Sequence, residues 1–141
     1  MEEITLQLSP TVSSEDLNAL FAASWDHHRP VDFQPILQRS FVYVCAVYHE
    51  RLIGFVNVAW DGGKHGFLLD TTVHPDFQRQ GVGRRLVQAA VDSCRARGLD
   101  WLHVDFEPHL SGFYRACGFQ PTAAGLIHLS DNEESQWPFP R

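Results

Sequence analysis

Apolar and polar residues alternate along several short segments of the chain, and a period of two is typical of β-strands. In the first of these segments Ile4, Leu6 and Leu8 alternate with polar neighbours. Later segments are rich in β-branched and aromatic residues, and short polar links between neighbouring segments indicate hairpins. The predicted strands are residues 4–8, 41–48, 52–60, 66–73, 99–106 and 122–129.

Apolar residues at helical spacing predict helices between these strands. The first helix begins after Ser13, which stands three residues before Asp16 in an approximate capping box, and it reaches Trp25. The other predicted helices are residues 35–39, 82–97 and 110–117. Because a helix joins the strand at 66–73 to the strand at 99–106, we expect these two strands to be parallel neighbours.

These elements predict a mixed α/β fold of the α+β type. Its central sheet is expected to be mostly antiparallel, with one parallel junction and with helices on both faces. The chain has 141 residues, of which 44% are apolar, enough to bury one core. We therefore predict a single domain over residues 1–130 and a solvated or loosely ordered tail over residues 131–141.

The charge balance narrows the range of partners. Eleven basic against seventeen acidic residues give a net charge of −6 at pH 7. This balance argues against nucleic acid, whose binding depends on neutralising phosphates, and it suits a cationic small molecule. No segment approaches the roughly 20 apolar residues of a membrane span, so no membrane partner is expected.

The cysteines and histidines add two further exclusions. Cys45, Cys94 and Cys117 are widely spaced and form no CxxC pair, so a disulfide scaffold is not expected. The eight histidines lack the spacing of metal ligands, and no metal is expected. Together with an acidic start that does not resemble a secretory signal, this composition predicts a cytoplasmic protein.

The most informative segment runs from residue 72 to residue 86, where a strand, a glycine-containing loop and a long helix follow one another. The first turn of a helix leaves backbone N–H groups without partners, and no Ser, Thr or Asn stands directly before Gly81 to cap them. Three basic residues crowd this positive end of the helix dipole: Arg79, Arg84 and Arg85. The pattern predicts an anion site, with a solvated helix start as the alternative.

Two familiar phosphate-binding loops do not match this segment. A P-loop would place Lys-Ser or Lys-Thr after its last glycine, where this chain has Arg84 and Arg85. A dinucleotide fingerprint would require a third glycine, where this chain has Leu86. Neither ATP hydrolysis nor NAD binding is therefore predicted.

The segment Gln78-x-x-Gly81-x-Gly83 resembles the acyl-CoA pyrophosphate loop of the GNAT superfamily of N-acetyltransferases. The run at residues 112–119, Gly-Phe-Tyr-Arg-Ala-Cys-Gly-Phe, is similar to a second landmark of that family. The resemblance covers residues 4–129 and implies a GNAT-like fold in which the two parallel strands splay apart. It also implies acetyl-CoA as co-substrate. The residues implied to hold it are Thr72, Val73, Gln78, Arg79, Gln80, Gly81, Val82, Gly83 and Arg84.

The resemblance assigns Tyr114 as the general acid that protonates the departing thiolate, with simple packing against Phe113 or Phe119 as the alternative. A backbone N–H near Thr72 or Val73, aimed by a strand bulge, is expected to stabilise the oxyanion. Asp70 is the one carboxylate on the strand that leads into the loop, so it is either the base or a hydrogen-bonded structural residue. Asp105 and Glu107 at the end of the next strand are competing bases, and loss of the proton through water is a further alternative. Strand alternation would place Asp70 on the same face as Leu68 and Thr72.

The resemblance also implies where an acceptor amine would bind, at the first helices and their loop, and Glu107 is an additional candidate to face the amine. Glu107 stands where family members frequently have Asn, and an ionised Glu donates no hydrogen bond to the cofactor arm. The candidate acceptor-binding residues are Trp25, Asp26, Phe33, Asp105 and Glu107.

The function implied is acetyl-CoA-dependent transfer of an acetyl group to a primary amine of a small molecule or peptide, by direct attack in a ternary complex. The alternative is a non-catalytic sensor or partner domain that binds acyl-CoA. Either a monomer or a homodimer is compatible with the sequence.

Overall fold

The computed structural model describes residues 3–130, and the chain divides into two compact units. The N-terminal unit is Met1–Val104 and the C-terminal unit is Asp105–Arg141. The predicted tail at 131–141 lies outside the described residues, and the single domain over 1–130 stays a prediction.

The N-terminal unit is built on a five-stranded sheet in the order β1-β2-β3-β4-β5. The strands are β1 (Thr5–Leu8), β2 (Val42–Tyr48), β3 (Arg51–Trp60), β4 (His65–Val73) and β5 (Trp101–Val104). The first four strands pair antiparallel and β5 pairs parallel with β4. The predicted mixed, mostly antiparallel sheet is confirmed.

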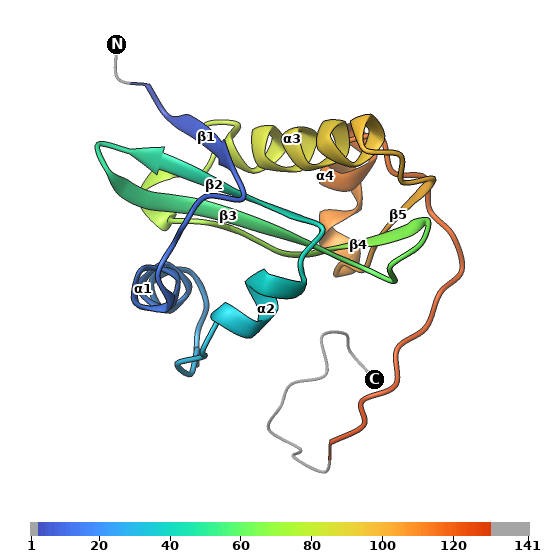
Figure 1. Ribbon diagram of the computed structural model, residues 1–141, viewed down its shortest axis with the longest axis horizontal. Coiled ribbons are helices and arrows are strands. Elements are labelled where there is room, and N and C mark those ends of the chain that lie inside the picture. The colour runs from blue at the N-terminus through green and yellow to red at the C-terminus, as the bar shows by residue number, and fades with distance from the viewer. Residues whose placement is uncertain (1–2, 131–141) are drawn as a thin grey trace. The chain divides into compact units, whose positions relative to one another are not determined.

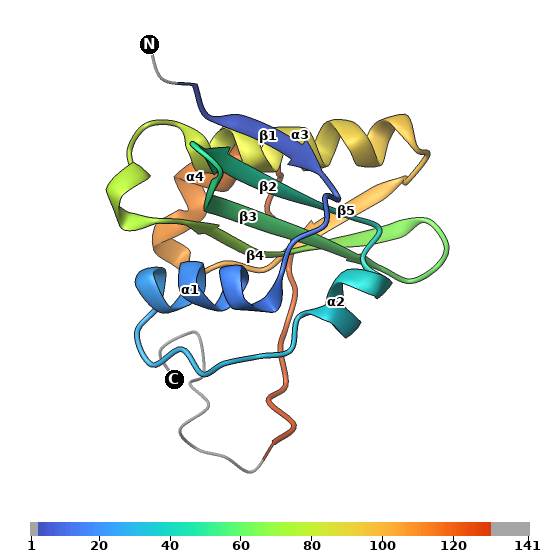
Figure 2. The same cartoon turned by 60° about the vertical axis from the view of Figure 1, so that its left-hand side comes forward.

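Helices cover both faces of this sheet (Figures 1 and 2). One face carries α1 (Ser14–Ser24) and α2 (Gln34–Arg39), and the other carries α3 (Val82–Ala96). Ser13 caps α1 as predicted, because its hydroxyl accepts a hydrogen bond from the Asp16 N–H at 3.0 Å. One cluster of buried apolar residues includes Leu17, Leu20, Phe21, Phe33, Leu37, Cys45 and Phe55.

The parallel pair β4–β5 is short. His65 to Leu68 of β4 pair with Trp101 to Val104, and β5 then ends. Residues 69–73 of β4 continue without a partner strand on that side of the N-terminal unit. An open strand edge therefore leads directly into the short 3₁₀ helix η1 (Pro75–Phe77) and the start of α3. This is the arrangement expected where two parallel strands splay apart.

The C-terminal unit contains η2 (Pro108–Leu110) and α4 (Ser111–Ala116) within its described residues. The strand predicted at 122–129 is wrong: these residues form no regular element and are exposed. Local alternation expresses only a preference, whereas a strand requires a neighbour that completes its hydrogen bonds. The strand predicted at 99–106 is likewise shorter, because only Trp101–Val104 find partners on β4.

Candidate functional site

A β-bulge interrupts β4 where its edge is open. Phe55 pairs with Thr72 and Asn57 pairs with Leu69, so two residues of β4, Asp70 and Thr71, face Val56 alone. Asp70 has φ of 61°, in the left-handed region that residues other than glycine rarely adopt. The bulge lies next to Thr72, where the family resemblance implies a bulge that aims a backbone N–H.

The bulge also reverses the strand's alternation. Leu68 pairs with Val58 and Thr72 pairs with Phe55. Val58 and Phe55 stand three residues apart on β3 and point to opposite faces, so Leu68 and Thr72 do as well. The predicted common face for Asp70, Leu68 and Thr72 is therefore wrong, because regular alternation does not survive an inserted residue.

Beyond the bulge, Val73 presents its backbone to the open edge. The His74 N–H donates to Ile53 O at 2.8 Å. In an antiparallel pair the backbone N–H and carbonyl of the preceding residue, Val73, therefore point away from β3. The Val73 carbonyl accepts from Gln78 Nε2 at 3.1 Å and from Ser24 Oγ at 3.4 Å. The Val73 N–H is thus directed to the open side, where an extended ligand could pair with it.

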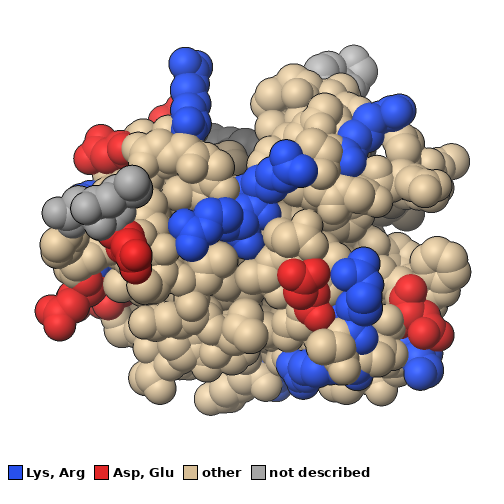
Figure 3. Space-filling view, turned by 90° about the horizontal axis from the view of Figure 1, so that it is seen from above, with Lys and Arg blue, Asp and Glu red and all other residues tan. Residues whose placement is uncertain are grey.

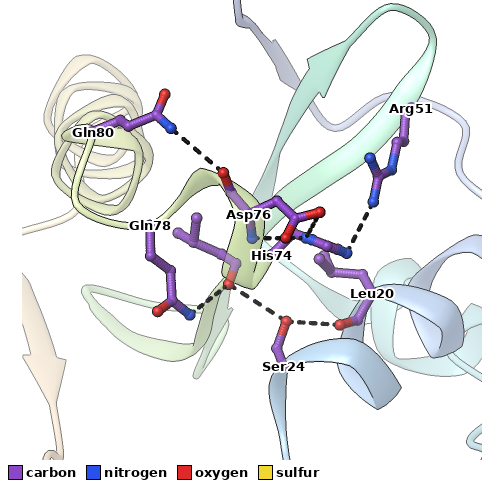
Figure 4. A network of polar contacts seen from close by, with 8 residues as sticks. Leu20, Ser24, Arg51, His74, Asp76, Gln78 and Gln80 are labelled. Carbon is purple, nitrogen blue, oxygen red and sulfur yellow. Dashed lines mark hydrogen bonds and ion pairs between the residues drawn. The ribbon is translucent and has the colours of Figure 1, made fainter.

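The loop between β4 and α3 is held by its own side chains (Figure 4). His74 Nδ1 accepts from the Asp76 N–H at 3.1 Å and so caps η1. Arg51 Nη2 lies 2.9 Å from His74 Nε2, and Gln80 Nε2 donates to the Asp76 carbonyl at 3.5 Å. The side chains of Gln78 and Gln80 therefore shape the loop. Sequence reasoning missed Ser24, Arg51 and His74, which become neighbours only through folding.

The N-terminus of α3 has no side-chain cap and no acidic residue in its first turn. Its first helical hydrogen bond runs from the Arg85 N–H to Gly81 O at 3.1 Å, so the N–H groups of Val82, Gly83 and Arg84 have no acceptor within the helix. Gly81 has φ of 81°, and a Cβ built there would meet nothing within 4 Å. An anion can approach this backbone closely and bind several N–H groups.

Basic side chains surround this helix start. Arg79 and Arg84 are exposed, and within residues 3–130 neither pairs with an acidic side chain. Arg85 instead donates to the Ile4 carbonyl at 3.0 Å and ties the helix to the start of β1. Figure 3 looks onto the face that carries α3, and basic side chains gather across its middle. In an acidic protein this concentration favours the anion site over a merely solvated helix start.

Asp70 sits at the bulge with a perturbed carboxyl group. Its side chain remains accessible to solvent, but surrounding protein atoms desolvate it and raise its pKa above the ordinary value. The Thr72 hydroxyl donates to the Asp70 backbone carbonyl at 2.9 Å and accepts from Trp25 Nε1 at 3.0 Å. A carboxyl whose pKa is raised is a stronger base than an ordinary carboxylate, which suits a proton acceptor.

Asp70→Asn is expected to raise the melting temperature at pH 7. Because desolvation raises the pKa of Asp70, the folded protein holds this proton more tightly than the unfolded chain, so ionisation at higher pH costs folding free energy. Asparagine removes that cost and tolerates the left-handed conformation. The gain should vanish well below pH 3.8, the ordinary pKa, where the proton is bound in both states. Thermal melts at neutral and acidic pH measure this.

Asp61→Asn is the control of opposite sign. Backbone N–H groups of Gly63 and His65 hold the pKa of Asp61 below its usual value, so its stabilisation is present at neutral pH and lost in acid. Its replacement should lower the melting temperature at pH 7. An Asp70→Asn protein that melts below the parent at pH 7 would contradict the account of Asp70.

The predicted acceptor residues separate into two groups. Trp25 is 51% exposed beside β4, and Asp26 follows it on the surface. Phe33, by contrast, is 3% exposed and packs 5.1 Å from Phe21 in the core. Its proposed contact with an acceptor is corrected: Phe33 leads into α2 and anchors that helix to the sheet.

The second sequence landmark lies in the C-terminal unit. Tyr114 of α4 is buried in an aromatic cluster, stacked on Phe106 at 4.9 Å and in edge contact with Phe113 and Phe119. The ring therefore packs as the alternative expected, and the acid role of the hydroxyl stays a prediction. Asp105 is exposed, and Glu107 forms an ion pair with His109 at 3.3 Å between Oε2 and Nδ1.

Among the described residues, no three His, Cys, Asp or Glu side chains are placed to hold a metal ion together. None of the described helices combines the length and the apolar character required to cross a membrane.

Residues 13–119 match the model of the acetyltransferase (GNAT) family. A curated relative, an uncharacterized N-acetyltransferase ycf52 of Gracilaria tenuistipitata var. liui, is 27% identical over 121 residues, which are 82% of this chain and 66% of the relative. The chain spans about two-fifths to two-thirds of the length of the first curated relatives it matches, and some of these are described as chloroplastic.

Solved structures agree with this match. The GNAT family protein SP0256 from Streptococcus pneumoniae TIGR4 superposes with a TM-score of 0.75 at 26% identity, covering 92% of this chain and all of the other. The aminoglycoside N-acetyltransferase AAC(6')-Iy in complex with CoA has the same fold, with a TM-score of 0.73 at 19% identity, over 93% of this chain and 97% of that one. The match of the family model over residues 13–119, on an opened sheet edge followed by an uncapped helix, shows that the chain belongs to the GNAT acetyltransferase family.

Proposed function

We propose that this protein is an acetyl-CoA-dependent N-acetyltransferase that acts on a primary amine of a small molecule or peptide. The observation that carries the proposal is the continuity of three features on one stretch of chain. The bulge at Asp70, the outward Val73 N–H and the uncapped start of α3 follow one another within residues 70–84.

In the proposed complex, successive parts of acetyl-CoA lie along successive parts of this stretch. The diphosphate would accept N–H bonds from the first turn of α3, with Arg79 and Arg84 adding positive charge. The pantetheine arm would extend along the open edge of β4 and pair with the Val73 N–H as an added strand would. The thioester would then lie toward the bulge. An aminoglycoside N-acetyltransferase with the same fold was solved in complex with CoA, which supports CoA as the ligand of this fold.

The chemistry requires an uncharged amine, a stabilised oxyanion and a protonated leaving group. In the proposed reaction the acceptor attacks the thioester carbonyl carbon as an uncharged amine, and Asp70 accepts the proton that its nitrogen loses on becoming an amide. A backbone N–H at the bulge stabilises the oxyanion. The C–S bond then breaks, and Tyr114 protonates the thiolate. A phenol with a pKa near 10 can supply a proton to a thiolate whose acid has a pKa near 8.5 when the two are brought into contact.

The finer features of the proposal come from charge and family. The acidic chain favours a cationic acceptor, and the exposed pair Trp25 and Asp26 offers an aromatic face and a carboxylate to receive it. We propose a cytoplasmic protein that functions as a monomer or a homodimer without a metal.

Titration calorimetry with acetyl-CoA and with dephospho-CoA, followed by an amine panel with detection of the released thiol, tests the proposal. Saturable acetyl-CoA binding together with thiol release that depends on an amine is the expected result. Binding without turnover of any amine would instead favour an acyl-CoA sensor. A folded protein that does not bind acetyl-CoA would overturn both functions.

A further inference from the structure

Trp25 has an exposed ring but an occupied N–H. It follows the last residue of α1, where its backbone N–H bonds Phe21 O at 2.8 Å, and 51% of the residue is accessible to solvent. Its indole N–H nevertheless points inward and donates to Thr72 Oγ1 at 3.0 Å. Core packing alone does not account for a tryptophan held in this way, because half of the residue remains accessible to water.

Thr72 is 2% exposed and connects Trp25 to the bulge. Its hydroxyl accepts from the indole and donates to the Asp70 carbonyl at 2.9 Å. Thr72 pairs with Phe55 in the sheet, and its hydroxyl contacts the bulge through the Asp70 carbonyl. The two bonds use both capacities of the hydroxyl, one as acceptor and one as donor.

The Asp70 carbonyl belongs to the one residue of β4 with a positive φ. A left-handed conformation at a residue that is not glycine persists only where its surroundings determine it. The bond from Thr72 acts on the peptide group that joins Asp70 to Thr71, and it therefore constrains the direction of the Thr71 N–H. Trp25 in turn orients the Thr72 hydroxyl, since a hydroxyl that accepts from the indole directs its own proton elsewhere.

We propose that Trp25 and Thr72 are positioning residues for acetyl transfer: the bonds from Trp25 Nε1 to Thr72 Oγ1 and from Thr72 Oγ1 to Asp70 O hold the β4 bulge in its productive geometry. This inference rests on the proposed function and deepens it. It assigns Thr72 a role through its side chain, and it makes the end of α1 part of the support of the reacting centre.

Thr72→Val and Thr72→Ser form the central pair of variants. Valine keeps the shape and removes both bonds, whereas serine retains the hydroxyl. Valine should lower kcat by about tenfold with the KM for acetyl-CoA within about twofold of the parent, and serine should restore most of kcat. Trp25→Phe, which keeps an aromatic ring on the surface, should lower kcat by about fivefold. Trp101→Phe is the matched control: this exposed tryptophan of β5 is outside the hydrogen-bonded chain, and kcat should not change.

A spectroscopic readout accompanies the kinetics. In ¹H–¹⁵N spectra the Trp25 indole resonance should lose its hydrogen-bonded shift and exchange faster in Thr72→Val, and it should keep both in Thr72→Ser. Melting curves establish that each variant is folded at the assay temperature. If Thr72→Val fails to fold, Trp25→Phe, a substitution at an exposed residue, tests the proposal in its place.

The results of these experiments distinguish a failure of the positioning role from a failure of the proposed function. A parent that turns over an amine while Thr72→Val or Trp25→Phe keeps the parental kcat overturns the positioning role and leaves the proposed function standing. Equal losses of kcat in the valine and serine variants also overturn it, because the hydroxyl would then be irrelevant. A parent without turnover overturns both. A valine defect that serine rescues, with the indole resonance following it, supports the proposal.

Discussion

Gly81→Glu is expected to weaken acetyl-CoA binding by about 100-fold or more while the protein remains folded. The new carboxylate would occupy the open space at the start of α3, where it would repel the diphosphate and compete for the N–H groups of the first turn. The positive φ of Gly81 adds backbone strain of about 1–2 kcal/mol for any other residue. Calorimetric titration measures the loss.

Gly98→Glu provides a closely matched control. Gly98 follows the same helix at its other end, has φ of 90°, and would likewise place a Cβ in open space. The same charge and a similar strain are introduced, but the site lies at the C-terminal end of α3. Acetyl-CoA affinity should stay close to that of the parent. Equal losses of affinity in both variants would show that strain or net charge is responsible, and the proposed diphosphate site would then be wrong.

Tyr114→Phe is expected to lower kcat by about 100-fold with little change in acetyl-CoA affinity. Phenylalanine retains the ring that packs against Phe106, Phe113 and Phe119, and it removes only the hydroxyl that would protonate the thiolate. Steady-state rates of thiol release, compared with calorimetric affinity, separate the two effects. A loss of binding without a loss of kcat would assign the hydroxyl to cofactor binding.

Tyr43→Phe serves as the tyrosine control. The Tyr43 hydroxyl donates to the Pro10 carbonyl, and its removal should lower stability by about 1 kcal/mol without changing kcat. A Tyr114→Phe protein that turns over like Tyr43→Phe would exclude the acid role. The thiolate would then leave without help from this residue.

The local parts of the site follow from the sequence because their causes are local. The end of β4, the loop and the start of α3 are adjacent in the chain, and the missing cap before Gly81 can be seen in the residues themselves. The structure describes the same helix start with no side-chain cap. The roles of the residues around it stay predictions until binding is measured.

The sequence predictions that the structure contradicts share a different cause. The strand predicted at 122–129 has the right alternation but no partner, and Phe33 has an aromatic side chain that the core takes up. The bulge at Asp70 exists because β4 has one residue more than β3 between two paired positions. None of these outcomes is visible in a single segment, because each depends on what packs or pairs against it.

By itself, the sequence determined the order and type of most elements and the family resemblance, and it predicted an anion site at residues 78–84. These follow from hydrophobic periodicity and from residue types at close spacing. Tertiary structure alone decided that Trp25 meets Thr72 across 47 positions of the chain, that Ser24 and Gln78 share the Val73 carbonyl, and that Asp70 stands at a bulge with a raised pKa. Hydrogen bonds and desolvation depend on which atoms lie close together in space. The packing of α1 against the sheet brings Trp25 to Thr72 and Ser24 to the Val73 carbonyl.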